Sequence, residues 1–265
     1  MRLSFFKKSI LLPLAVCFGL SACVTTNEVS GRNQFIIYGE DQDVPMGVQA
    51  MEEIKKNNEV ITSGPYAERV KRLGMRIAAV SDRPDFPWEF IAIKSDQLNA
   101  FALPGGQAAV YTKMLDSFTD EELAAVMGHE IAHAVLRHGM EQVSRGQATG
   151  AFVGIIGAVV GGGEENADTQ KGAMELASLV SAVGVSLPHS RKMELEADHI
   201  GTIYMARAGY DPRKAVVLWK KMAALSAGAQ KPPKWLSTHP TDTTRIERLE
   251  ERMDEYMAIY NEAKK

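Results

Sequence analysis

The amino-acid sequence predicts a mainly helical α+β domain with a small antiparallel sheet. The chain has 265 residues, of which 45% are hydrophobic and 24% are charged, as in one globular domain rather than a disordered or fibrous chain. Apolar residues recur at three- and four-residue spacing over most of the length, which is the period of a helix. Between residues 88 and 112 the pattern alternates instead, and this predicts short strands.

Residues 1–22 predict a lipoprotein signal peptide. Three basic residues precede an apolar run that is too short to span a bilayer comfortably. The run ends in Leu-Ser-Ala-Cys, which resembles a bacterial lipobox and makes Cys23 the expected lipidation site. Val24 stands where an Asp would suggest inner-membrane retention, so the resemblance to Gram-negative lipoproteins implies the outer membrane, facing the periplasm. The alternative is an ordinary secretory signal that happens to end in Cys.

Residues 23–44 are largely polar and rich in turn formers, which predicts a tether leading into a domain of residues 45–265. A short apolar stretch at residues 34–38 could dock on that domain. Residues 45–57 and 66–81 predict two amphipathic helices, because their apolar residues recur every three or four positions.

Three short strands are predicted next. The first carries alternating apolar residues that give it two distinct faces. The second and third are joined by Pro-Gly-Gly, which predicts a hairpin, and we expect it to be exposed. The strands are expected at residues 88–94, 99–103 and 107–112.

Beyond the strands the pattern is almost entirely helical. Four glycines between residues 150 and 161 are spaced three or four apart, so they place small residues on one helix face for close packing or a mobile cover. We expect residues 150–187 to cover part of a site built by the helices on either side. Further helices are predicted at residues 192–208, 212–225 and 242–263, with a break at Lys-Pro-Pro.

The strongest motif is His-Glu-Ile-Ala-His at residues 129–133. Thr119 and Glu122, three residues apart, form a plausible capping box at the start of the same helix. Residues four apart lie one turn above each other, so His129 and His133 can hold one zinc ion. Glu130 would flank that ion and could take a proton from its bound water. The alternative, a helix with two hydrogen-bonded histidines, is costly in an apolar helix unless something pairs them.

A third ligand is available downstream. Glu194 and Asp198 lie one turn apart on a second predicted helix, while Glu196 lies on a different face. Glu194 can ligate the metal while Asp198 orients a ligand imidazole from behind. Without the His-Glu-Ile-Ala-His motif, a solvated charged helix face would be the favoured interpretation.

Four motifs in order identify a resemblance. Asn-Ala-Phe-Ala-Leu-Pro-Gly-Gly at residues 99–106, the 129–133 motif, the Glu194 to Asp198 pair preceded by Ser-Arg, and Ser-Thr-His-Pro at residues 237–240 resemble the HtpX-like and CAAX-prenyl-protease-like zinc metallopeptidases. Within them, the chain is most similar to the short periplasmic lipoprotein branch typified by LoiP and BepA. The resemblance implies a zincin-like (gluzincin) domain.

The resemblance also implies site residues. It makes Glu194, rather than Glu196, the third ligand beside His129 and His133 of one Zn²⁺ per chain, and it places His239 near the metal. His239 could then either occupy the open zinc position at rest or donate to the oxyanion formed during peptide hydrolysis. Of the other histidines, His138 is expected to be structural or to support the site from behind, His189 to lie exposed in a loop, and His199 to lie at the surface.

The sequence predicts a zinc endopeptidase of the bacterial envelope that cleaves unfolded or misassembled proteins. An unpaired strand edge can bond an extended substrate, so the residues expected at the cleft are Ala100, Phe101, Ala102 and Leu103. The alternative is a chaperone-like assembly or quality-control factor for outer-membrane proteins with low or regulated proteolysis, and outer-membrane assembly machinery is a candidate partner. Glu130 favours the enzyme, because zinc binding alone does not require it.

Composition excludes other classes. A net charge of -3, from 30 basic and 33 acidic residues, offers no basic excess for nucleic acid. Two cysteines are too few for a disulfide scaffold or a cysteine-based zinc site.

Overall fold

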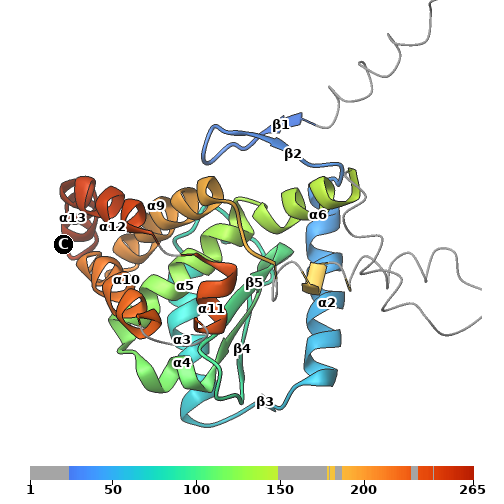
Figure 1. Ribbon diagram of the computed structural model, residues 1–265, viewed down its shortest axis with the longest axis horizontal. Coiled ribbons are helices and arrows are strands. Elements are labelled where there is room, and N and C mark those ends of the chain that lie inside the picture. The colour runs from blue at the N-terminus through green and yellow to red at the C-terminus, as the bar shows by residue number, and fades with distance from the viewer. Residues whose placement is uncertain (1–23, 149–177, 179, 183–186, 228–231, 241) are drawn as a thin grey trace, which may run out of the picture.

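The structure is a computed structural model and describes residues 24–148, 178, 180–182, 187–227, 232–240 and 242–265. Its centre is a four-stranded sheet in the order β3-β4-β6-β5 (Figure 1). The strands are β3 (Val60–Ile61), β4 (Glu89–Ile93), β5 (Ala100–Leu103) and β6 (Gln107–Tyr111).

The sheet is mixed, not antiparallel as predicted. β5 and β6 form the expected antiparallel hairpin, but β4 pairs with β6 in parallel. After β4 the chain first forms β5 at the edge of the sheet. It then returns as β6, which lies between β4 and β5. Sequence alternation finds strands but does not set their order, because both pairings use the same period.

The hairpin is buried, which corrects the prediction that it is exposed. One face of the sheet packs on α3 (Pro65–Ala78) and α5 (Asp120–Val135), and the other packs on α2 (Asp43–Asn57). Phe90 and Ala92 of β4 face the first core and Ile91 and Ile93 face the second, as the alternation predicts. Because both faces are covered, an extended chain could pair with the sheet only at an edge strand, and β5 is the edge strand that packs against α5.

The register of β5 decides which main-chain groups face that outer edge. The amide of Tyr111 donates to the carbonyl of Asn99 over 3.0 Å, so this pair is hydrogen-bonded. Bonded and non-bonded pairs alternate in an antiparallel ladder, so Ala100 and Ala102 direct their N–H and C=O groups away from β6. Leu98 has the same orientation, and its carbonyl accepts from the amide of Trp235 over 2.9 Å.

Helices α5 and α9 (Arg191–Arg207) cross at two glycines. A Cβ built on Gly128 would lie 2.6 Å from the carbonyl oxygen of Gly201, and one built on Gly201 would lie 2.6 Å from the carbonyl carbon of Gly128. No larger residue fits at this crossing without moving a backbone. The close approach brings the residues that follow Gly128 toward the first turns of α9.

Further helices in the described part of the chain are α4 (Thr112–Ser117), α6 (His138–Ala148), α10 (Arg213–Ser226), α11 (Lys234–Thr238), α12 (Thr243–Glu251) and α13 (Met253–Ala263), with short 3-10 turns η1 (Glu40–Gln42) and η2 (Pro104–Gly106). The single helix predicted at residues 242–263 is thus two. Arg252 has non-helical backbone angles between them, and the bend lets α13 pack against α9.

Residues 24–38, which we call the strap, pack against the domain that follows them. They form a hairpin of β1 (Val24–Thr26) and β2 (Asn33–Phe35) and then run along α6 (Figure 1). The amide of Ile37 donates to Ser144 Oγ over 3.1 Å, and Ile36 is buried with the residues of α2, as the predicted docking of residues 34–38 requires.

Other predictions fall on residues outside the described part. These are the signal peptide, Cys23 and almost all of the segment at residues 150–187. Within the described residues, no helix combines the length and the apolar character needed to cross a membrane.

Candidate metal centre

Helix α5 carries its polar motif in the interior of the molecule. Thr119 and Glu122 form the predicted capping box, each side chain bonding the backbone of the other. Every residue from Glu122 to Val135 is buried, and the side chains of His129 and His133 are each only 3% exposed. Buried imidazoles and a buried carboxylate are costly without partners, so the surroundings of the motif have to supply them.

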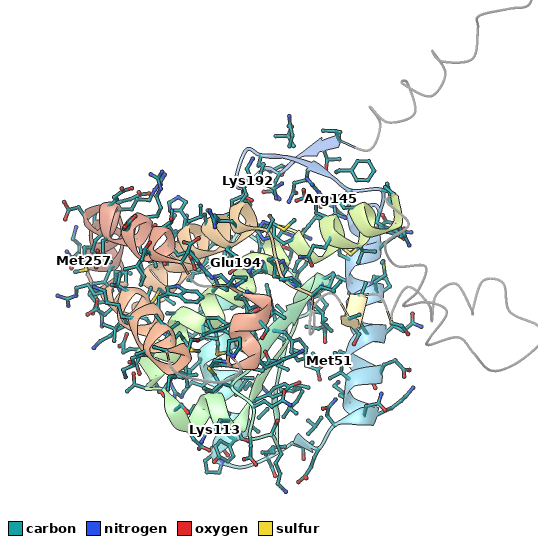
Figure 2. The ribbon with its side chains drawn as sticks, viewed as in Figure 1. Met51, Lys113, Arg145, Lys192, Glu194 and Met257 are labelled. Atoms are coloured by element: carbon teal, nitrogen blue, oxygen red, sulfur yellow. The ribbon has the colours of Figure 1, made fainter. Side chains whose placement is uncertain are left out.

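Four potential ligand atoms meet beside the motif. His129 Nε2 lies 3.0 Å from His133 Nε2 and 3.2 Å from His239 Nδ1. The carboxylate of Glu194 lies 3.5 Å from His129 Nε2, 3.4 Å from His133 Nε2 and 3.0 Å from His239 Nδ1. All four residues are buried, and Glu194 lies near the centre of the molecule (Figure 2).

These distances fit a metal site. A tetrahedral zinc site with bonds of about 2.0–2.1 Å places neighbouring ligand atoms roughly 3.3 Å apart. The distances of 3.0–3.5 Å among the imidazole nitrogens and the two oxygens of Glu194 match that spacing. Three imidazoles and one carboxylate suit zinc as a donor set. His239 contributes to this cluster through Nδ1, at the position of a fourth ligand.

A buried arginine supports the carboxylates. Arg245 donates to both oxygens of Asp198 at 2.6 and 2.7 Å and lies 2.6 Å from Glu194 Oε2. Asp198 Oδ1 in turn lies 3.0 Å from His129 Nδ1. Burial alone would raise the pKa of Glu194, but the charge of Arg245 and the neighbouring imidazoles hold it well below its usual range.

Neighbouring charges push the two motif imidazoles in opposite directions. Burial lowers the pKa of His133, and the nearby His189 and His129 lower it further, so the ring stays neutral. Burial also disfavours a charged His129, but its bonds to Asp198 and Glu194 outweigh burial and raise its pKa to about 9. Without a metal, a proton on His129 therefore supplies the positive charge that the surrounding carboxylates favour.

Glu130 has its own donor. Trp235 Nε1 donates to Glu130 Oε1 over 2.7 Å, and His239 Nε2 lies 3.4 Å from the same oxygen. Both residues come from α11 and the turn after it, and the backbone amide of Trp235 also donates to the carbonyl of Leu98 before β5. The carboxylate is thereby fixed beside the ligand cluster without being one of its ligands.

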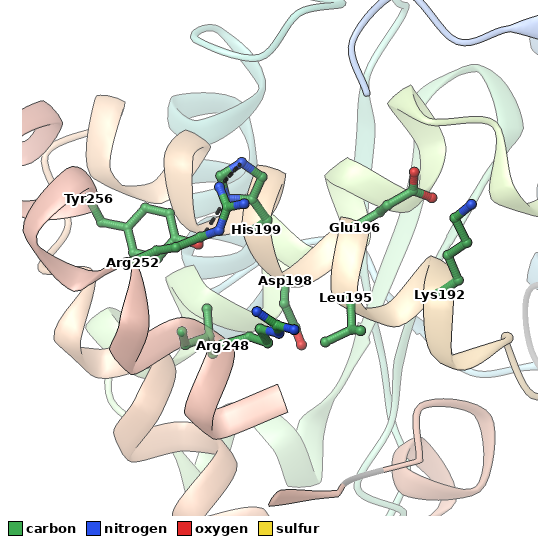
Figure 3. Close-up of a pocket in the computed structure, with 9 residues that line it drawn as sticks. Lys192, Leu195, Glu196, Asp198, His199, Arg248, Arg252 and Tyr256 are labelled. Atoms are coloured by element: carbon green, nitrogen blue, oxygen red, sulfur yellow. Dashed lines mark hydrogen bonds between the residues drawn. The ribbon is translucent and has the colours of Figure 1, made fainter. Parts of the chain in front are cut away.

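Glu196 and Asp198 contact different histidines. Figure 3 shows the two carboxylates leaving α9 in opposite directions. Asp198 turns toward His129, while Glu196 Oε2 lies 3.3 Å from His138 Nε2. The pocket in Figure 3 lies between α9, α12 and α13 and contains none of the four potential ligands.

Two histidines differ from expectation. His189 was expected to lie exposed, but its ring stacks on His133 with 4.0 Å between centroids, and its buried Nδ1 has no hydrogen-bond partner. His199 was expected at the surface; it is half-buried and lies 2.9 Å from the hydroxyl of Tyr256. His189 lies just before α9 and His199 lies within it, and the local sequence gives no sign of their contacts with α5 and α13.

Two of the four predicted cleft residues lie beside this cluster. Ala102 and Leu103 line a small cavity together with His133 and His189. Ala100 and Phe101 are almost fully buried in the two cores on either side of the sheet. The part of β5 next to the metal centre is therefore its C-terminal half.

Two residues of this site were not predicted from the sequence: Trp235 and Arg245. Trp235 lies four residues before His239 and could have been found from its place beside the Ser-Thr-His-Pro motif. Arg245 carries no local signal, because arginines in polar segments are usually solvated.

Comparison with known proteins is consistent with this geometry. The family model of Peptidase family M48 matches residues 66–253. The chain is 34% identical over 231 residues to mitochondrial metalloendopeptidase OMA1 of Schizosaccharomyces pombe, covering 86% of this chain and 66% of that protein. It is 28% identical over 210 residues to the beta-barrel assembly-enhancing protease of Escherichia coli, covering 77% of this chain and 42% of that protein.

A third relative is mitochondrial metalloendopeptidase OMA1 of Arabidopsis thaliana, which is 34% identical over 221 residues. That alignment covers 82% of this chain and 43% of the relative. The chain thus spans less than two thirds of the length of these three relatives.

Proposed function

Because the chain belongs to peptidase family M48, we propose that it is a zinc-dependent endopeptidase that hydrolyses peptide bonds in proteins. The observation that carries the proposal is Glu130, a buried carboxylate held beside four converging ligand atoms but not among them. A structural metal site has no need of such a group, whereas peptide hydrolysis does.

His129, His133 and Glu194 would hold the zinc. When bound, the ion supplies Lewis acidity toward the scissile carbonyl and the attacking water. Glu130 accepts the proton of that water and then delivers it to the leaving amine. The hydrogen bond from Trp235 occupies Oε1 of Glu130, and this leaves Oε2 for proton transfer.

The outer edge of β5 is the proposed substrate site. Ala100 and Ala102 direct main-chain groups away from β6, and the cavity at Ala102 also contains His133. An extended chain bonded there would be recognised through its backbone, with little demand on side-chain identity. We therefore propose unfolded or misassembled proteins as substrates.

His239 is proposed to alternate between two roles. Its Nδ1 lies within the ligand cluster, where it blocks the position needed by water, and its Nε2 faces Glu130. It sits in the turn after α11, a helix of only five residues. When displaced from the cluster, the ring could donate a hydrogen bond to the oxyanion.

The location proposed is the outer membrane, with a lipid anchor on Cys23 and the domain facing the periplasm. The lipobox-like sequence before Cys23 supports it. On the same ground we propose that the chain belongs to the short periplasmic lipoprotein branch of its family. A relative is named a beta-barrel assembly-enhancing protease, and this likeness makes outer-membrane assembly machinery a proposed partner.

The test compares the wild-type chain with Glu130→Gln. Both proteins are expected to bind one zinc, because Glu130 is not a ligand, and only the wild type is expected to degrade an unfolded protein such as casein. Equal degradation by both would remove Glu130 from the chemistry. A wild type that binds zinc and unfolded outer-membrane protein without cleaving it would support the chaperone-like function instead.

A further inference from the structure

A line of hydrogen bonds runs from a metal ligand to the strap. His133 Nδ1 lies 2.9 Å from His138 Nδ1, and His138 Nε2 lies 3.3 Å from Glu196 Oε2. Arg32 Nε donates to that same oxygen over 2.6 Å. Arg32 is the last residue before β2, more than a hundred positions upstream of His133 in the chain.

If His133 binds a metal, the hydrogen bonds along this line can be donated in only one direction, from His133 toward Glu196. Binding through Nε2 needs a lone pair there, so the ring proton of His133 is on Nδ1 and is donated to His138. His138 then accepts at Nδ1 and carries its own proton on Nε2, which it donates to Glu196. A metal-bound histidine usually donates to a carboxylate or a carbonyl. Here the acceptor is a second imidazole, whose tautomer must itself be fixed.

Arg32 holds Glu196 in place as the acceptor of the hydrogen bond from His138. Its side chain is 8% exposed, and its guanidinium divides its donors between two carboxylates. Two nitrogens bond the fully buried Glu141, at 3.0 and 2.6 Å, while Nε bonds Glu196. The planar fork of arginine provides this geometry, which a lysine cannot reproduce.

The strap is bound at the end of the metal-bearing helix as well. Gln34 Nε2 donates to the carbonyl of Leu136, directly after α5, over 2.7 Å, and Asn27 Nδ2 reaches the same carbonyl at 3.4 Å. Within the strap, the amide of Asn27 bonds the carbonyl of Arg32 over 2.8 Å, which closes the turn that carries Arg32.

We propose that Arg32, Glu196 and His138 are positioning residues for the metal ligand His133, and that the β1–β2 hairpin thereby forms part of the metal centre. Removing Arg32 leaves Glu196 and His138 free to rearrange, and a His138 that carries its proton on Nδ1 can no longer accept from His133. The inference rests on the proposed function only in taking zinc as the ion at His133.

The first experiment measures zinc affinity of the full chain by competition with a chromophoric chelator. Loss of an outer partner of a ligand usually weakens metal binding 10- to 100-fold. Arg32→Ala is expected to weaken it about tenfold and Arg32→Lys by less, because lysine keeps the charge but not the fork. The absorption spectrum of the cobalt-substituted chain should shift in Arg32→Ala, since the orientation of the His133 ring changes.

Arg145→Ala is the matched control. Arg145 also pairs with Glu141, at 2.7 Å, but from a side chain that is 59% exposed. It is expected to leave zinc affinity and the cobalt spectrum as in the wild type. Equal affinities for Arg32→Ala and Arg145→Ala would overturn the proposal. If Arg32→Ala does not fold, Glu196→Gln provides the same comparison.

A second experiment separates this inference from the proposed function. Ring ¹⁵N NMR of the zinc-loaded, histidine-labelled chain reports where each imidazole carries its proton. The wild type is expected to show it on Nδ1 of His133 and Nε2 of His138, and Arg32→Ala is expected to show mixed tautomers of His138. A wild-type His138 protonated on Nδ1 would overturn the inference, whereas a zinc-loaded chain with the expected tautomers that cleaves no unfolded protein would overturn only the proposed function.

Discussion

Arg245 provides the positive charge that allows two carboxylates to lie buried at the back of the metal centre. Its side chain is 1% exposed and stacks over the ring of Trp219 at 3.6 Å. It bonds Asp198 through two nitrogens and approaches Glu194 with the third. A charged group so deeply buried is stable only because every one of its neighbours is complementary.

Arg245→Met should therefore destabilise the metal-free chain by about 3–5 kcal/mol, because Asp198 and Glu194 would lose their counter-charge. Urea unfolding monitored by circular dichroism measures this loss. Arg248→Met, at an exposed position on the same helix, is the control and should change little. A small loss in Arg245→Met would mean that the two carboxylates need no counter-charge from this residue.

His239→Ala tests which role this histidine plays at rest. Because its Nδ1 lies at the position of a fourth ligand, the variant should keep its zinc and cleave an unfolded substrate faster than the wild type. Initial rates at matched zinc occupancy provide the measurement, with His199→Ala as the control. Slower cleavage would identify the oxyanion role as dominant, and unchanged rates would place His239 outside the reaction.

At the scale of elements, the crossing of α5 and α9 sets the dimensions of the site. Its ligands come from both helices, and their separation depends on the contact between Gly128 and Gly201. Helix α11 then brings Trp235 and the residues of the following turn against the same cluster. The ligand spacing is thus a property of helix packing rather than of any single helix.

Gly201→Ala should force α5 and α9 apart. Overpacking of this kind costs about 1–3 kcal/mol, and the displaced helix should also weaken zinc binding. Thermal unfolding and chelator competition measure the two effects. Lys192→Ala, at an exposed position of α9, should alter neither. Normal zinc affinity in Gly201→Ala would show that the site tolerates a wider crossing.

Ala102→Pro tests the outer edge of β5. The N–H lost from Ala102 points away from β6, so the sheet keeps its ladder while the substrate loses a donor. The variant should retain zinc and show a raised KM for unfolded substrates. Ala102→Val, which keeps the N–H, is the control. Unchanged kinetics in the proline variant would remove β5 from the substrate site.

For the whole molecule, the proposed anchor and the metal centre are connected through the strap. Residue 24 opens the hairpin that carries Arg32, and Cys23 directly precedes it. On the proposed topology, the domain therefore lies close to the membrane, with no long spacer between the anchor and the folded hairpin.

Cys23→Ser should release the chain from the membrane, because no acyl chain could then be attached at residue 23. Membrane fractionation and labelling with a palmitate analogue measure this outcome. Cys17→Ser is the matched control, since that cysteine lies within the predicted signal peptide and should leave attachment unchanged. Retention of Cys23→Ser in membranes would contradict the lipoprotein assignment.

The sequence by itself determined the features that depend on local spacing. Helix geometry places residues four apart on one face, so His129 and His133, and likewise Glu194 and Asp198, could be paired before any fold was known. The capping box, the β5–β6 hairpin and the alternating faces of β4 are local in the same sense. Resemblance to known peptidases then selected Glu194 over Glu196.

Only the tertiary structure decided the features that depend on contacts between distant segments. The parallel pairing of β4 with β6, the burial of the hairpin and the stacking of His189 on His133 all follow from how elements pack. Arg245 and Arg32 look like surface residues in the sequence and are buried among carboxylates in the fold. The physical reason is that periodicity reports one helix or strand at a time, whereas a buried charge is stabilised by partners that only the packed chain brings within reach.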